Sequence, residues 1–199
     1  MDSTWGKGIV KNQAETVYSF DYGDVHFAVL NSGTDFSKAD TITILTEQAK
    51  WLDEDLAATD KKWKIVMIHQ GMYPAKTERY NTKEPLLEVI DKHQVDLVLQ
   101  GHDHVVARTY PMRGDVIVTK ESIDTVTKGT GTIYNILGSS GLKRYDMIAN
   151  TPEWFAVLNA TSANQPTYTV FKVDSDSIDV VTKQMNGLIV DEYSIVENK

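Results

Sequence analysis

Two short apolar runs, each preceded by an amphipathic stretch, constrain the fold of this chain more than any other feature. Residues 63–69 and 95–99 are rich in Ile, Val and Leu without polar alternation, a pattern typical of strands buried on both faces. Residues 44–60 and 82–93 repeat apolar side chains at helical spacing, which predicts two helices. Because buried strands need cover, we expect the helices to lie against a sheet.

The rest of the chain is predominantly β-like. Residues 16–22 and 25–30 flank a two-residue turn and predict a hairpin. Residues 138–165 show no strong periodicity and are predicted to be a long loop. Further strands, the last three of them forming a meander, are predicted at 105–110, 115–118, 132–137, 167–173, 178–184 and 188–196. The order predicts an α/β fold, a mixed β-sandwich flanked by helices.

Composition excludes several functional classes. The 199 residues carry 20 basic and 28 acidic side chains, a net charge of −8. Without a basic cluster, a nucleic-acid-binding surface is not expected. No apolar run approaches the roughly 20 residues that a membrane-spanning helix needs. The absence of cysteine excludes disulfides, thiolate metal sites and cysteine nucleophiles. A metal would therefore need His, carboxylate or amide ligands.

Three of the five histidines stand directly after the two apolar runs. His69 ends the first run, and His102 and His104 follow the second across Gly101. In an extended chain, residues two apart point to one side, so both imidazoles would face a common point. If the two strands are neighbours, His69 reaches the same point, because ligands gather at the carboxyl ends of such strands. The pattern predicts a metal site for zinc, iron, manganese or nickel.

A structural role is the alternative for each histidine. A single histidine often caps a strand or lies on a solvated loop, and we interpret His26 and His93 in that way. The segment Gly138-Ser-Ser-Gly141 lacks the spacing of a phosphate-binding loop, and its serines lack a nucleophile elbow. We interpret it as an ordinary loop. The three histidines after apolar runs favour metal binding over the structural interpretation.

These residues also carry a family resemblance. Val66-Met-Ile-His69 with Tyr73, and Gly101-His-Asp-His104 with Arg108, resemble the last two signature blocks of the calcineurin-like metallophosphoesterases. The resemblance is to their purple acid phosphatase-like branch, and it extends in order and spacing over the hairpin, the first helix and the closing meander. It implies a helix-flanked β-sandwich that hydrolyses phosphate esters, mono- or diesters, with a two-metal centre.

The resemblance also implies a role for each of the matching residues. His69 and His102 would bind the second metal and His104 the first, while Tyr73 and Arg108 would lie near the substrate mouth. The two ions would be iron, manganese or zinc. The signature block that distinguishes a tyrosine-ligated from an aspartate-ligated first metal is not found, so the identity of the metals stays open.

Three earlier signature blocks of the family do not appear upstream of His69. We therefore expect residues 1–199 to be the carboxyl-terminal portion of one catalytic domain. Alone, the chain would bind at most one ion weakly, zinc or nickel, and would be inactive. The missing half would leave an apolar face or a free sheet edge, so we expect a homodimer.

A second functional class stays open. The chain could be a non-catalytic surface or carbohydrate-binding module that retains the sandwich. The three intact histidines argue against this class, whereas the missing signature blocks favour it. The cysteine-free, acidic composition fits a secreted or surface protein of a bacterium.

Overall fold

The computed structural model describes residues 4–5, 16–32, 38–75, 82–141, 143, 151–159 and 165–198. Within these residues the chain forms two helices, α1 (Lys38–Ala58) and α2 (Lys83–Lys92). The strands are β1 (Thr4–Trp5), β2 (Tyr18–Tyr22), β3 (Val25–Leu30), β4 (Trp63–Ile68), β5 (Leu97–Gln100), β6 (Val106–Thr109), β7 (Met112–Arg113), β8 (Val116–Ile117), β9 (Thr125–Thr127), β10 (Ile133–Leu137), β11 (Phe155–Asn159), β12 (Thr167–Val173), β13 (Ser177–Gln184) and β14 (Ile189–Val196). Neither helix is long and apolar enough to cross a membrane.

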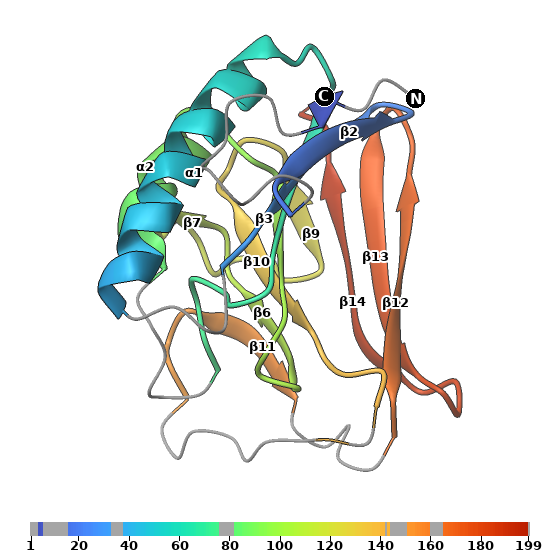
Figure 1. The fold of residues 1–199 in the computed structure, drawn as a ribbon. Helices are drawn as coiled ribbons and strands as arrows, with labels where there is room; N and C mark the ends of the chain where they lie inside the picture. Colours follow the sequence, from blue (N-terminus) through green and yellow to red (C-terminus); the bar gives the residue numbers. More distant parts are fainter. Residues whose placement is uncertain are drawn as a thin grey trace.

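Two sheets form the sandwich (Figure 1). The larger sheet has eight strands in the order β1-β2-β3-β4-β5-β10-β6-β11, and the smaller has four in the order β12-β13-β14-β9. Strands β3, β4, β5 and β10 run parallel in the middle of the larger sheet. Their carboxyl ends therefore meet at one edge, where the sequence places the histidines. A separate two-stranded ribbon joins β7 and β8.

Each face of the larger sheet buries its own hydrophobic core. Helices α1 and α2 cover one face, where Leu52 and Ile90 pack against Val66 and Val98. The smaller sheet covers the other face (Figure 1). Fully buried Trp63 lies in this second core and donates its indole N–H to the carbonyl oxygen of Asp174, 2.9 Å away. Cover on both faces explains why β4 and β5 lack polar alternation.

The predicted fold class is confirmed: a mixed α/β sandwich with helices outside the sheet. The hairpin β2–β3, both helices and the closing meander β12–β13–β14 form where they were predicted, although α1 begins six residues earlier. The prediction of an unbroken loop at 138–165 is wrong, because β11 lies there and pairs with β6. Strands β1, β7 and β9 were not predicted, since two or three residues carry no periodicity.

A buried histidine fastens the β2–β3 hairpin to α1. The Nδ1 atom of His26 lies 2.7 Å from an Asp21 carboxylate oxygen, and its Nε2 atom lies 2.8 Å from one of Asp55. Asp55 also accepts a hydrogen bond from the Ser19 hydroxyl at 2.7 Å. Burial opposes the charged imidazolium, but hydrogen bonds and the negative charges of Asp55 and Asp21 outweigh it and raise the pKa of His26. The structural interpretation of His26 agrees with these contacts.

We expect the His26 cluster to make stability pH-dependent. Since the folded-state pKa is raised, protonated His26 stabilises the fold below its ordinary pKa, and this contribution is lost as the pH rises through the folded-state pKa. The measurement is the free energy of urea unfolding from about pH 6 to pH 9. The Asp55→Asn variant should flatten this dependence. Glu54→Gln, an exposed neighbour on α1, should leave it unchanged. Parallel profiles for all three proteins would contradict the prediction.

Candidate metal and phosphate-ester site

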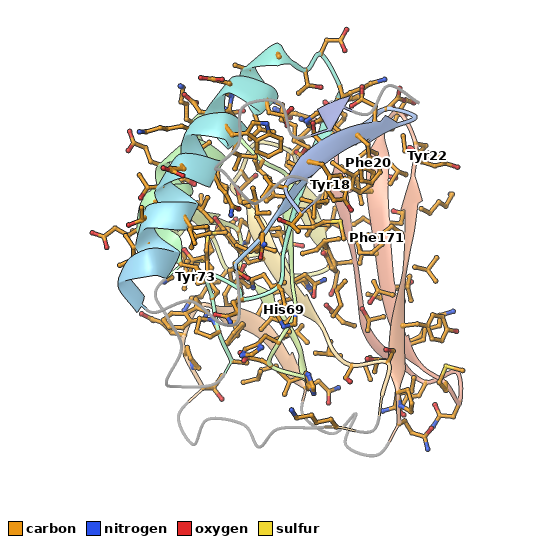
Figure 2. The ribbon with its side chains drawn as sticks, in the orientation of Figure 1. Tyr18, Phe20, Tyr22, His69, Tyr73 and Phe171 are labelled. Carbon is orange, nitrogen blue, oxygen red and sulfur yellow. The ribbon has the colours of Figure 1, made fainter. Side chains whose placement is uncertain are left out.

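Two neighbouring parallel strands bring His69 and His102 together. Strands β4 and β5 pair in register, with Ile68 opposite Gln100, and the chain leaves both at the same edge. His69 follows β4 directly, and Figure 2 labels it in the lower half of the molecule. The Nδ1 atom of His102 lies 3.2 Å from the Nε2 atom of His69, and their ring centroids are 5.1 Å apart. The structure thus brings together two of the three predicted ligands.

The ring of His104 contacts the backbone of Lys143. Its Nδ1 atom lies 3.1 Å from the carbonyl oxygen of Lys143. A proton on Nδ1 would place the ring lone pair on Nε2. No group of three or more His, Asp or Glu side chains in the described part of the chain could hold a metal ion. In that part of the chain, the three imidazoles do not converge on one point, contrary to the expectation.

The turn after β5 is not extended, contrary to expectation. His102 has φ 73° and His104 has φ 50°, both in the left-handed region. Such a conformation costs an L-residue about 1–2 kcal/mol, so the alternation argument for their shared direction does not hold. Backbone bonds offset this cost: Gly101 N–H donates to His69 O at 3.0 Å, and Asp103 N–H donates to Gly101 O at 2.9 Å. Strained residues of this kind are frequent at functional sites.

Asp103 anchors this turn to the loop after β4. It is 3% exposed, and its Oδ2 atom accepts a hydrogen bond from the Ala75 N–H at 2.6 Å. The neighbouring Gln100 accepts a hydrogen bond from the Tyr73 N–H at 3.1 Å. Gln100 was not identified from the sequence. Its signal is a polar residue at the end of an otherwise apolar strand. Both side chains hold the two histidine-bearing loops against each other.

The absence of a side chain at Gly101 leaves space for the imidazole ring of His69. A Cβ atom at position 101 would lie 3.1 Å from His69 Nδ1 and 3.4 Å from the His69 carbonyl oxygen. We expect Gly101→Ala to displace the imidazole and to lower the free energy of unfolding by about 1–3 kcal/mol. Chemical denaturation measures the loss, and the nitrogen resonances of His69 report the displacement. Gly141→Ala, on an exposed loop, should cost less than about 0.5 kcal/mol. Equal costs for both variants would contradict this prediction.

An apolar depression opens beside His69. It has a volume of about 330 Å³ and is open to solvent. Its lining is mostly aliphatic and comes from β3, β4, β5 and the end of β10, namely Val29, Leu30, Met67, Ile68, His69, Leu99, Gln100, Gly101 and Leu137. The described wall offers few polar groups, so a phosphate group would bind at the histidines rather than in this depression.

The placement of Tyr73 differs from the expectation of a substrate-mouth residue. The side chain is fully buried on the helix-covered face, with its ring centroid 4.4 Å from that of Tyr134. The ammonium group of Lys83 lies 4.0 Å from the Tyr73 ring centroid. Burial, together with the nearby Tyr134 and Asp115, raises the pKa of the Tyr73 hydroxyl well above its usual value. Tyr73 is a core residue that stays protonated.

Arg108 is also placed away from the histidines. It lies on β6 and is 1% exposed, on the face that the smaller sheet covers. Its guanidinium donates to both carboxylate oxygens of Asp191, at 2.8 and 2.9 Å, and stacks 4.2 Å from the ring centroid of Tyr193. The residue that was expected at a substrate mouth instead joins the two sheets. An arginine committed to a buried carboxylate is not available to a phosphate group.

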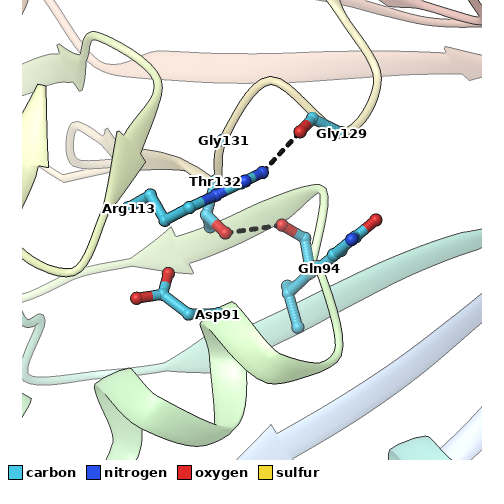
Figure 3. A pocket seen from close by; sticks show the side chains of 7 residues that line it. Asp91, Gln94, Arg113, Gly129, Gly131 and Thr132 are labelled. Atoms are coloured by element: carbon cyan, nitrogen blue, oxygen red, sulfur yellow. Dashed lines mark hydrogen bonds between the residues drawn. The ribbon is translucent and has the colours of Figure 1, made fainter. Parts of the chain in front are cut away.

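Figure 3 shows a small cavity from close by, and its lining residues place it near the starts of β5 and β10. Its volume of about 10 Å³ has room for one water molecule. Val95 and Thr132, which line it, precede the parallel strands β5 and β10, whereas the histidines follow the carboxyl ends of β4 and β5. Thr132 Oγ1 donates to Val95 O at 2.7 Å, and Arg113 donates to Gly129 O at 2.5 Å. This cavity is separate from the histidine site.

Comparison with known proteins gives consistent matches. The sequence model of the calcineurin-like phosphoesterase family matches residues 5–106. A protein named "Probable inactive purple acid phosphatase 1" from Arabidopsis thaliana is 26% identical over 156 residues, 72% of this chain and 24% of that protein. An "Acid phosphatase" from Aspergillus ficuum is 30% identical over 135 residues, 48% of this chain and 22% of that protein. The chain thus spans about a quarter of the length of these relatives.

The fold has a solved counterpart. Purple acid phosphatase PPD1 from yellow lupin seeds superposes on 95% of this chain and 34% of its own, with a TM-score of 0.79 and 22% identity. That likeness supports the sandwich and its strand order. The family match covers the hairpin, both helices and the histidine-bearing strands, and it shows that the chain belongs to the calcineurin-like phosphoesterase family.

Proposed function

We propose that this chain forms part of a metal-dependent hydrolase of phosphate esters and contributes the carboxyl-terminal ligands of its metal centre. The observation that carries the proposal is the pair of imidazole nitrogens, 3.2 Å apart, at the ends of two adjacent parallel strands. Membership of the calcineurin-like phosphoesterase family and acid phosphatase relatives support the reaction class. The substrate would be a phosphate mono- or diester.

The donor atoms fit a metal ion. Two imidazole nitrogens bound to one tetrahedral zinc ion, each at about 2.0–2.1 Å, lie about 3.3–3.4 Å apart. The His102 Nδ1 and His69 Nε2 atoms are 3.2 Å apart, close to that separation. His69 is exposed, so an ion can reach the pair from solvent. His69 and His102 would hold one ion, and His104 would contribute to a second one.

The residues of this chain would bind the metal ions and hold the ligating histidines in position, but they would not supply the whole site. When bound, the ions would supply Lewis-acid stabilisation of the negative charge that develops on the phosphoryl oxygens. Asp103 and Gly101 would hold the two histidine-bearing loops in place, since their contacts join the turn after β5 to His69 and Ala75. Carboxylate ligands would come from elsewhere in a longer protein, of which residues 1–199 form the carboxyl-terminal part of the catalytic domain.

The experiment compares metal uptake with turnover. We expect calorimetric titration of the 199-residue chain with zinc, nickel or manganese salts to show weak uptake of at most one ion, because neutral imidazole ligands leave the charge of a divalent ion unbalanced. His69→Ala should abolish this uptake. We expect no metal-dependent hydrolysis of a chromogenic phosphate ester by the chain alone. A longer protein that contains the chain and further carboxylate ligands should bind two ions of iron, manganese or zinc and hydrolyse the ester.

Two outcomes would contradict the proposal. Turnover by the chain alone would show that its own residues complete the site. A longer protein that binds no metal and hydrolyses no ester would favour the non-catalytic module, an alternative supported by the relative named "Probable inactive purple acid phosphatase 1".

A further inference from the structure

Strand β12 forms an unprotected edge of the smaller sheet. It is the end strand of that sheet and, among the described residues, it pairs with β13 alone. The seven residues of β12 contain no proline, and its pairing with β13 is continuous, without a bulge. A long, regular edge strand presents a row of backbone donors and acceptors that another strand can pair with.

The hydrogen bonds show which β12 residues present these groups. Alternate residues of an antiparallel strand direct their N–H and C=O groups to opposite neighbours. The carbonyl oxygen of Pro166 accepts from Met185 N–H on the β13 side at 3.1 Å, whereas the Thr167 N–H donates to Ser139 O at 2.9 Å, away from β13. Even-numbered residues of β12 therefore bond to β13. Odd-numbered residues direct their groups to the free edge.

The side chains beside this edge are partly uncovered. Tyr168 and Val170 point to the outer face and are 44% and 50% exposed. Phe171 and Val173 point inward and pack only partly buried against the core between the sheets. Figure 2 labels Phe171 within the smaller sheet. The edge thus combines unpaired backbone groups with apolar side chains that a partner strand would cover.

We propose that this edge is a dimerisation surface, on which β12 of a second copy of the chain pairs antiparallel to the first, centred on Val170. Because the Thr167 N–H already donates to Ser139 O, this register relies on the edge-directed groups in the middle of the strand, and it places Thr169 opposite Phe171 of the partner copy. Both residues direct their backbone groups to the edge, so they exchange two hydrogen bonds on each side of the axis. The four-stranded sheets of the two copies would join into one of eight.

The sequence of β12 fits a second copy because it is self-complementary. In the centred register, Tyr168 lies opposite the exposed Lys172 of the other copy, a cation–π pair, and Val170 lies opposite itself. A symmetric interface must bring each residue onto a compatible partner, and no like charges meet here. The chain has a net charge of −8, but β12 carries no acidic residue. Two β12 strands can therefore approach each other without repulsion between carboxylates on the strands themselves.

A cysteine-free chain allows a direct test by disulfide formation. Val170→Cys places two thiols in directly opposed positions, close enough for a bond, and should yield a covalent dimer under mild oxidation. Tyr168→Cys is the matched control, because the centred register puts its two copies four residues apart, about 13 Å, beyond disulfide reach. We expect efficient cross-linking for the first variant and little for the second.

A second measurement does not depend on chemical cross-linking. Sedimentation equilibrium of the native chain at micromolar concentration should show a dimer. Val170→Lys, at an exposed position, should weaken the dimer at least about tenfold by opposing two like charges across the axis. Tyr22→Lys, 72% exposed on the other sheet, should leave it unchanged. A monomeric native chain, or equal cross-linking of both cysteine variants, would overturn the proposal. Failure of the Val170→Cys variant to cross-link in a longer protein that contains this chain would also overturn the proposal.

Discussion

Replacing Arg108 by methionine is expected to lower the free energy of unfolding by about 3–5 kcal/mol. The side chains of Arg108 and Asp191 are 2% and 3% exposed, and two hydrogen bonds join them. Without the guanidinium, the Asp191 carboxylate stays buried with no compensating charge, which is the costly half of a broken buried ion pair. Urea unfolding at neutral pH measures this loss.

The double variant separates the ion pair from simple packing. Arg108→Met combined with Asp191→Leu should recover most of the stability, because an apolar pair of similar volume carries no free-energy cost of removing charges from water. Lys92→Met breaks the more exposed pair with Asp53 and should cost far less stability than Arg108→Met. If Arg108→Met were as stable as the native chain, the buried pair would be unimportant, and a role for Arg108 at the substrate would regain support.

His102→Ala is expected to remove measurable zinc uptake, whereas Asp103→Asn should weaken it about tenfold at most. The imidazole of His102 is one of two candidate ligands, 3.2 Å from His69. Asp103 instead holds the Ala75 N–H, a bond that an asparagine oxygen can still accept. Competition with a chromogenic zinc indicator measures both affinities. The same order is expected for turnover in a longer, active protein.

A histidine away from the site supplies the matched control. His93 lies at the end of α2, where its Nε2 atom is 2.6 Å from Asp53. His93→Ala should leave zinc uptake unchanged. Equal losses for His102→Ala and Asp103→Asn would mean that Asp103 acts at the metal and not on the loop.

The fold was more accessible from the sequence than the site. Buried strands and amphipathic helices leave recognisable patterns, so β4, β5 and α2 were predicted close to their observed bounds, whereas α1 begins six residues before its predicted start. Adjacent parallel strands then bring His69 and His102 to one edge. Their separation of 3.2 Å follows from the register of Ile68 with Gln100, which depends on pairing rather than on local sequence.

The remaining site residues depended on contacts that no local pattern carries. Arg108 lies on a strand buried throughout, and its partner Asp191 is 83 residues away. Nothing near Arg108 in the sequence distinguishes an arginine that binds phosphate from one that binds a buried carboxylate. The left-handed turn at His102 and His104 likewise arises from bonds to the neighbouring loop.

The hydrogen bond from Trp63 to Asp174 has a consequence for biosynthesis. It joins groups 111 residues apart, across the interface of the two sheets. On a translating ribosome, β4 would emerge long before the strands of the smaller sheet have been synthesised. Its apolar face would meanwhile be exposed to chaperones and to other nascent chains. Such distant pairing also gives a high contact order and slow folding. In a variant that keeps Trp63 and replaces the other three tryptophans by phenylalanine, the change in fluorescence during refolding would therefore report when the two sheets close on each other.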